Sequence, residues 1–390
     1  MSTKESPARL QSLDALRGFD MLFIMGFAAL VISICSLWPD STVAQWIAGQ
    51  MEHVEWHGLR HHDTIFPLFL FLAGVSFPFS MASSMAKGRT RQQIAWKAVR
   101  RGLILVFLGM VYNGFFRLDF SSLRCASVLG RIGLAWMLAA LLYLWCKPRT
   151  SALFAVIILI SYWLVMWLVP GSADPYSLQD NLVGVVDRAL LPGRLLYGNP
   201  AMGLESGWFD PEGLLSTIPA IATALFGMLT GSFVRLPEET VAGGKKALWM
   251  AVAGVGFTAV GYAWNMVFPI NKMLWTSSFV CVLAGYSLLL FALFYWLIDV
   301  KGWRKWAFPL RVIGMNSITI YLAQRIIDFH GIARFFFGGA ASFCDAPWSE
   351  IILLAAYLIV SWLFLFFLYR KRVFLKVLLH LLHLSGKPFA

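Results

Sequence analysis

Long apolar runs dominate the pattern of hydrophobic and polar positions along this 390-residue chain. The runs are about 20 residues long, the length that a helix needs to cross a bilayer. They are continuous and do not alternate, which argues against a transmembrane β-barrel. They predict an all-α, polytopic transmembrane helix bundle of about ten spans, at residues 19–38, 64–86, 98–116, 126–146, 151–170, 214–234, 246–268, 273–298, 306–327 and 350–369.

The segments outside these runs are short, with two exceptions. The loop 171–213 is rich in Gly, Pro and acids, and it is too long to be a mere connector. The tail that begins at Arg370 mixes basic and apolar residues, which predicts a C-terminal amphipathic helix at the membrane surface. Because no linker divides the chain, we expect a single transmembrane domain over residues 1–390.

Composition agrees with a membrane protein in contact with lipid. Hydrophobic residues make up 59% of the chain and charged residues only 13%, whereas a soluble domain carries about 25% charged residues. The five cysteines show no CxxC or metal-binding spacing. Two of them, Cys125 and Cys344, fall near the predicted outer face, where a disulfide between them stays an open question.

The net charge of +12 is distributed unevenly between the two ends of the predicted bundle. One set of loops and ends holds 23 of the 32 Lys and Arg residues, and most acids lie on the other side. The positive-inside rule then predicts that both termini are cytoplasmic. Because membrane topology accounts for these Lys and Arg residues, nucleic acid is not the expected partner. This basic rim either serves topology alone or also binds an anionic ligand.

Titratable side chains crowd at the start of the second run. Four of the seven histidines, His53, His57, His61 and His62, are followed directly by Asp63. Three interpretations fit this cluster. The i, i+4, i+8 spacing of the first three would share a helix face and could bind a metal, although Gly58 weakens a helix there. The histidines could also be scattered surface groups. The third interpretation is proton transfer, with an imidazole as general base and a carboxylate to orient it.

Polar residues inside the predicted spans are the next candidates, because charge within a membrane is costly. Arg131 follows Arg124 by seven residues, about two turns of helix, so both could face one cavity. Arg131 could instead extend to the membrane surface. Asn316 lies in an apolar span, where it serves either a site or a helix–helix hydrogen bond.

Five segments occur in an order that resembles one known family. That family is the heparan-α-glucosaminide N-acetyltransferases, including the bacterial NagX-like members, and the resemblance covers most of the chain. Its most specific motif is H-x-x-W-x-G-x-x-x-x-D-x-x-F-P, which begins here at His53. The segments are LDALRGFDMLFIMG (13–26), HVEWHGLRHHDTIFPLFLFLAGVS (53–76), RCASVLGRIGLAW (124–136), FDPEGLLSTIPAIATALFGMLTG (209–231) and GMNSITIYL (314–322).

The resemblance implies an enzyme that carries an acetyl group from cytosolic acetyl-CoA to an amino sugar such as glucosamine on the other side of the membrane. The family's catalytic histidine corresponds to His53. This chain departs from the animal enzyme in having His57 after the motif's Trp and Gln324 shortly after the GMNSI segment. It is also expected to lack the large lumenal N-terminal part of that enzyme. These departures concern the acceptor more than the reaction.

We therefore expect a multi-pass acyltransferase of the bacterial inner membrane. The expected catalytic pair is His53 as base or acyl carrier, with Asp63 orienting it. The expected acceptor-binding residues are Trp56, His57, Asp210, Glu212, Arg124, Arg131 and Asn316. The expected contacts to acetyl-CoA are made by Arg17, Arg100 and Arg101, and no metal is expected.

Several alternatives remain open. Asp210 and Glu212 could bind a cationic amino sugar or could only cap the following helix. A transporter of amino sugars or oligosaccharides also needs polar residues within its spans. A structural partner in a glycan-assembly complex would tolerate the loss of His53. N- versus O-acetylation, an acetyl-His53 intermediate and a homodimer are not decided by the sequence.

Overall fold

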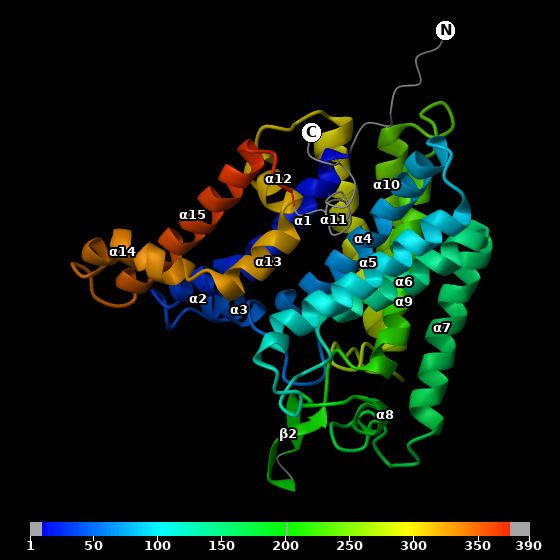
Figure 1. Ribbon diagram of the computed structural model, residues 1–390, viewed down its shortest axis with the longest axis horizontal. Coiled ribbons are helices and arrows are strands. Elements are labelled where there is room, and N and C mark those ends of the chain that lie inside the picture. Colours follow the sequence, from blue (N-terminus) through cyan, green and yellow to red (C-terminus); the bar gives the residue numbers. More distant parts are fainter. Residues whose placement is uncertain (1–9, 200–201, 375–390) are drawn as a thin grey trace, which may run out of the picture.

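The computed structural model describes residues 10–199 and 202–374, and nearly all regular structure in them is helical (Figure 1). The elements, in chain order, are α1 (Gln11–Leu22), η1 (Phe23–Phe27), α2 (Ala28–Cys35), α3 (Thr42–Gln50), α4 (His61–Ala86), α5 (Arg91–Tyr112), η2 (Phe115–Arg117), α6 (Val128–Trp145), α7 (Pro148–Leu168), α8 (Leu182–Leu190), β1 (Tyr197–Asn199), β2 (Leu204–Phe209), α9 (Leu214–Val234), α10 (Gly243–Trp264), α11 (Ser277–Phe294), η4 (Tyr295–Val300), α12 (Phe308–Met315), α13 (Ser317–Ile326), α14 (Phe329–Ala341) and α15 (Trp348–Arg370).

Eight helical segments in the described part of the chain are long and apolar enough to cross a membrane. They correspond to eight of the predicted spans, and the span predicted at 214–234 coincides with α9. The expectation of a polytopic helical membrane protein is therefore confirmed.

The other two predicted spans differ from the expectation of simple apolar crossings. The run at 98–116 belongs to α5, a 22-residue helix whose first half carries Arg91, Lys97, Arg100 and Arg101. Because of these charges, α5 is not one of the eight segments that are apolar enough to cross a membrane. The span predicted at 306–327 is not one helix, because the chain breaks at Asn316, where φ is −127° and ψ is 27°, into the short helices α12 and α13.

The centre of the bundle is the contact between α4 and α9. The two backbones touch where glycines face each other's carbonyls. A Cβ built on Gly227 would lie 2.1 Å from the Phe71 carbonyl oxygen, and one on Gly74 would lie 2.3 Å from that of Ala224. Small residues permit such close approach between membrane helices. The contact fixes α4, whose first turn carries part of the candidate site.

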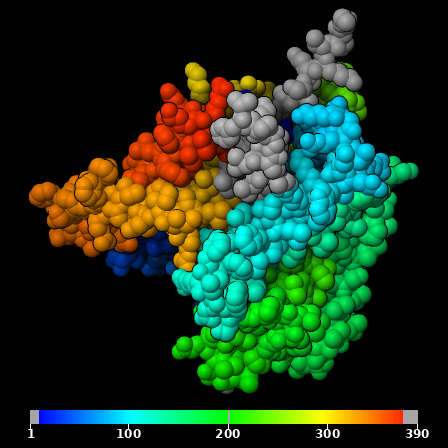
Figure 2. Space-filling view, viewed as in Figure 1, coloured from blue at the N-terminus to red at the C-terminus, as the bar shows by residue number. Residues whose placement is uncertain are grey.

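A second group of helices lies beside this core. The first span bends at Gly26, where φ is 114°, a value that glycine adopts without strain. Helices α1 and η1 pack there against α12, α13 and α15. Figures 1 and 2 show that α14 and the adjoining part of α15 extend sideways from the main bundle.

The helix connections gather at two ends of the molecule. The α4–α5 turn and the α11–α12 connection lie at the upper end in Figure 1, while α8 and β2 lie at the opposite end. Strands β1 and β2 form a small antiparallel pair within the long loop at 171–213. All five cysteines lie in the described residues and are free, so Cys125 and Cys344 do not form a disulfide. Most of the predicted C-terminal amphipathic helix, from residue 375 onward, falls outside the described residues.

Candidate active site

The histidine segment is an irregular stretch between α3 and α4, and helix α4 begins only at His61. The helical face proposed for His53, His57 and His61 therefore does not exist. Within the described ranges no group of three or more His, Cys, Asp or Glu side chains is arranged to hold a metal ion. The segment is tied down instead by the Gly58 amide, which donates to the Ile270 carbonyl over 2.8 Å.

His53 and Asp63 lie in direct contact. The Nδ1 atom of His53 is 2.7 Å from Oδ1 of Asp63. Asp63 is fully buried in the first turn of α4, and its Oδ2 accepts hydrogen bonds from the Val54 and Arg60 amides at 3.3 and 3.2 Å. The His53 side chain is 45% exposed. A fixed carboxylate on Nδ1 favours the tautomer that leaves Nε2 unprotonated, which is the form a general base needs.

Lys272 completes this cluster, although no pattern in the sequence predicted it. Its Nζ lies 3.3 Å from Oδ1 of Asp63 and 3.0 Å from Nδ1 of His53. Burial lowers the pKa of the Lys272 ammonium, and the neighbouring Asp63 carboxylate opposes that shift. The shorter His53–Asp63 distance indicates that Nδ1 donates to the carboxylate, so Lys272 mainly serves as a counter-charge for Asp63.

The loop that carries Lys272 connects α10 to α11 and is held rigidly. The Asn271 side chain accepts from the Leu274 amide at 2.8 Å, and the Asn271 amide donates to Thr276 Oγ1 at 3.1 Å. The only sequence signal was one lysine in the short connection between two predicted spans. Because it is 219 residues from His53 in the chain, spacing could not reveal the contact.

The other residues of the motif have structural contacts. The Trp56 indole Nε1 donates to the Tyr176 carbonyl at 2.8 Å and packs against Phe209, which joins the histidine segment to the long loop. His57 Nδ1 is 3.3 Å from the Asn271 side-chain nitrogen, and burial lowers the pKa of His57. The ring of His62 lies 4.5 Å from the ring of His53. His57 and His62 therefore stand beside the cluster, while Trp56 anchors it.

Arg124, Asp210 and Glu212 form a second charged group. The Arg124 guanidinium donates to both oxygens of Asp210 at 2.7 Å and also to Glu212. Burial alone would lower the pKa of Arg124, but its bonds to Asp210 and the charge of Glu212 raise it above its ordinary value. Asp210 is fully buried. Both acids are thus engaged with Arg124 and are not open for a cationic sugar.

Arg131 does not share a cavity with Arg124, contrary to the expectation. Helix α6 begins only at Val128, so Arg124 lies in the preceding loop and the two-turn relation fails. Arg131 is buried inside the bundle, where it donates to the Pro211 carbonyl and the Ser216 hydroxyl. Its guanidinium also lies 4.8 Å from the centre of the Trp275 ring. These contacts attach α6 to the start of α9.

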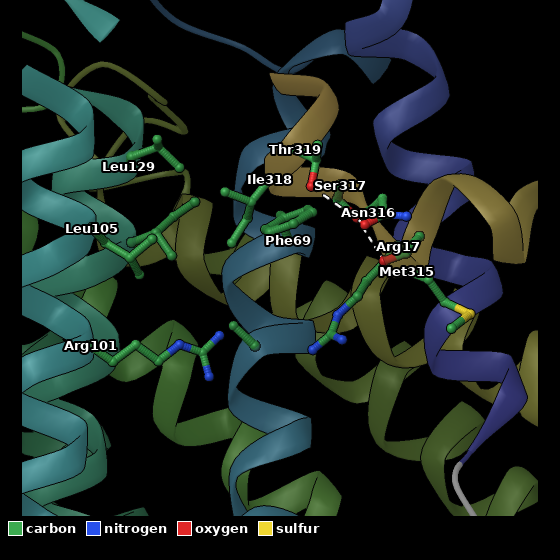
Figure 3. A pocket seen from close by; sticks show the side chains of 13 residues that line it. Arg17, Phe69, Arg101, Leu105, Leu129, Met315, Asn316, Ser317, Ile318 and Thr319 are labelled. Atoms are coloured by element: carbon green, nitrogen blue, oxygen red, sulfur yellow. Dashed lines mark hydrogen bonds between the residues drawn. The ribbon is translucent and has the colours of Figure 1, made fainter. Parts of the chain in front are cut away.

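Two of the three predicted donor-binding arginines meet in one internal pocket of about 120 Å³. Figure 3 shows Arg17 from α1 and Arg101 from α5 reaching into it from opposite sides, with Asn316 at the α12–α13 break. Arg17 donates to the Leu72 carbonyl at 3.3 Å and to Ser76. The Asn316 side-chain nitrogen is buried and has no hydrogen-bond partner within the described residues.

Arg100 is separated from this internal pocket. It lines a surface pocket of about 390 Å³ near the α4–α5 turn, together with Lys87, Arg89, Trp96 and Lys97. Adjacent residues on a helix point in different directions, so Arg100 and Arg101 face different spaces. The predicted arginine group is therefore divided between an outer basic pocket and an inner one.

Comparison with known proteins gives a consistent result. No family model matches the chain. Over 423 residues the chain is 25% identical to the human heparan-alpha-glucosaminide N-acetyltransferase, covering 95% of this chain and 60% of that protein. The mouse protein of the same name is 26% identical over 422 residues, with coverage of 96% and 61%. The chain thus spans about 60% of the length of these relatives. Their similarity extends along nearly the whole chain and supports the resemblance carried by the motifs: the chain is similar to the heparan-alpha-glucosaminide N-acetyltransferases.

Proposed function

We propose that this protein is a membrane acetyltransferase that moves an acetyl group from acetyl-CoA to an amino group or hydroxyl of a sugar. The contact between His53 Nδ1 and the buried Asp63 carboxylate carries the proposal. It supplies an oriented and accessible base at one end of a helical bundle. The names of the relatives, which describe N-acetyl transfer to heparan-alpha-glucosaminide, support the same reaction class.

The donor enters from the basic end in this proposal. The surface pocket around Arg100 falls within the range of about 300–1,000 Å³ that small-molecule sites occupy, so it suits the nucleotide. The smaller pocket between Arg17 and Arg101 suits the narrower arm that ends in the thioester. Arginine matches phosphate oxygens with paired donors. The bilayer core is about 30 Å thick, so donor and acceptor meet inside the bundle.

The chemistry assigned to His53 is proton removal from the acceptor. Nε2 takes the proton as the acceptor nitrogen or oxygen bonds to the acetyl carbon, and the carbon–sulfur bond breaks to release the CoA thiolate. Asp63 holds the imidazole through Nδ1. An alternative order places the acetyl group first on His53 and then on the acceptor. Rapid quenching followed by peptide mass analysis distinguishes them, because only the second order gives acetylated His53.

The proposed orientation places the basic end and both chain termini in the cytoplasm of a bacterial cell, in its inner membrane. The histidine segment then faces the periplasm. The uneven distribution of Lys and Arg supports this orientation. The location of the α4–α5 turn opposite α8 and β2 in Figure 1 is consistent with it.

The decisive test uses the purified full chain with acetyl-CoA and glucosamine. We expect His53→Ala to lower acetyl transfer by about 100-fold or more, the contribution typical of a general base. His330→Gln is the matched control, since His330 stacks on Tyr357 in the α14–α15 region and has no role in the proposal. Unchanged turnover by His53→Ala would remove His53 from the mechanism.

One observation favours a transporter as the second candidate. The broken pair α12–α13 resembles the discontinuous helices that line transport sites at mid-membrane depth. A transporter consumes no acetyl-CoA. Glucosamine uptake into proteoliposomes without acetyl-CoA, and without any acetylated product, would favour it over the acetyltransferase.

A further inference from the structure

A separate pocket lies where the ends of α5 and α13 meet the loops before α6 and after α8. Its volume is about 340 Å³, within the size range of small-molecule sites. Four arginines line it, namely Arg117, Arg124, Arg194 and Arg325. His53, Asp63 and Lys272 are not part of its lining.

The fold holds these arginines in place although they come from three separate segments: the α5–α6 connection, the loop after α8, and α13. Arg124 forms an isolated antiparallel bridge with Gly193, and the Arg194 amide donates to the Leu123 carbonyl at 3.1 Å. The Asn113 side chain donates to the Arg124 carbonyl at 2.9 Å. The Arg325 guanidinium lies 5.7 Å from the centre of the Tyr112 ring. The cluster is therefore built by the fold and does not depend on one flexible loop.

The charges of this pocket are only partly balanced. Arg124 is engaged with Asp210 and Glu212. Within residues 10–199 and 202–374, the other three arginines form no ion pair with an acid. The single carboxylate in the lining, Asp119, accepts hydrogen bonds from Ser122 and Ser121, which lower its pKa to about 2. Asp119 is thus ionised but bound to its own loop.

Like charges repel when they line one concave surface, and such a surface concentrates anions. A bound anion would offset the unfavourable free energy of this repulsion. The basic pocket also stands out because this end of the molecule is otherwise rich in acids. Guanidinium groups bind the oxygens of carboxylate, sulfate or phosphate in pairs. We propose that this pocket binds a small polar ligand through an oxyanion group held by Arg117, Arg194 and Arg325. The proposal goes beyond acetyl transfer and does not depend on it.

Three sources share this chemistry: a sugar acid, free phosphate and a phospholipid headgroup. Calorimetric titration of the detergent-purified full chain with glucuronate, inorganic phosphate and glycerol 3-phosphate separates them, and glucose is the uncharged control. We expect saturable binding of at least one anion, weakened by added chloride because the contacts are ionic. The tightest of the three identifies the source. Absence of saturable binding for all three would overturn the proposal.

Arg194→Gln tests the pocket itself. Loss of one charge-assisted contact should weaken anion binding about ten- to a hundredfold, and Arg194→Lys, which keeps the charge but not the paired donors, should fall between. Arg334→Gln is the matched control, because Arg334 is also an exposed arginine but does not line the pocket. Gel filtration of each variant verifies the fold. Equal affinities in the Arg194→Gln and Arg334→Gln proteins would also overturn the proposal.

Discussion

At the scale of single residues, the site combines one exposed imidazole with a buried carboxylate and a largely buried ammonium. Asp63 is fixed by two backbone amides and faces both His53 and Lys272. A charge is inexpensive to bury only when it is paired and hydrogen-bonded. The cluster meets that condition through contacts between segments that lie far apart in the chain. Lys272 is therefore expected to position and tune the base without touching the acceptor.

Replacing Lys272 tests this role through the rate of the reaction. Lys272→Gln removes the counter-charge that faces the buried Asp63 carboxylate, so we expect kcat/KM to fall by about tenfold. Lys272→Arg keeps the charge and should retain most of the wild-type rate. A loss of rate that Lys272→Arg does not restore would mean that Lys272 only supports the loop.

At the scale of elements, a buried titratable carboxyl group joins α8 to the start of α9 and makes stability depend on pH. Asp187 of α8 is buried, and its Oδ1 accepts from the Leu214 amide at 3.1 Å, while Oδ2 has no partner in the described part of the chain. Burial raises the pKa of Asp187 to about 7. Its carboxyl group is thus protonated in the folded protein at pH values where the unfolded chain has lost that proton.

The sign of the linkage follows from this difference. Between about pH 4 and pH 7 the folded state holds one more proton at Asp187, so its stability falls with rising pH by up to about 1.4 kcal/mol per unit. Asp187→Asn removes this term and retains an acceptor for Leu214. We expect its gain in thermal midpoint over the wild type to be larger at pH 8 than at pH 5. A gain that is the same at both pH values would contradict the assignment.

The α4–α9 contact gives a second prediction at this scale. A methyl group at Gly227 would meet the Phe71 carbonyl oxygen at 2.1 Å, whereas one at Gly256 in α10 would meet nothing within 4 Å. Overpacking typically costs about 1–3 kcal/mol. Gly227→Ala should lower the thermal midpoint of the purified protein, and Gly256→Ala should not. Equal midpoints for the two variants would show that the helices can separate without cost.

The helices were more predictable from the sequence than the site. Apolar runs located eight crossings, because length and composition suffice to define such a helix. The break at Asn316 was not predicted, since the residues around it are apolar enough for a continuous span. The pairing of His53 with Asp63 was predictable, because a histidine and a carboxylate lie only ten positions apart in the chain. Lys272, and the division of Arg100 from Arg101 between two pockets, depend on tertiary packing that local patterns do not encode.

At the scale of the whole molecule, the account requires that the two ends face different compartments. A cysteine at Glu55, in a background without native cysteines, should react with a membrane-impermeant maleimide in cells whose inner membrane is intact. A cysteine at Lys305, in the α11–α12 connection, should react only after lysis. Reversed labelling of the two positions would place the histidine segment in the cytoplasm and rule out the proposed direction of transfer.

Acetyl transfer across a sealed membrane is the measurement that separates the proposed enzyme from every alternative. Proteoliposomes would carry the full chain with its orientation determined, labelled acetyl-CoA on the side of the basic end, and glucosamine on the side of the histidine segment. We expect N-acetylglucosamine to form in the glucosamine compartment with the wild-type chain and with His330→Gln, but not with His53→Ala. Product that forms only when donor and acceptor share one compartment, or that forms equally well with His53→Ala, would contradict the proposed function.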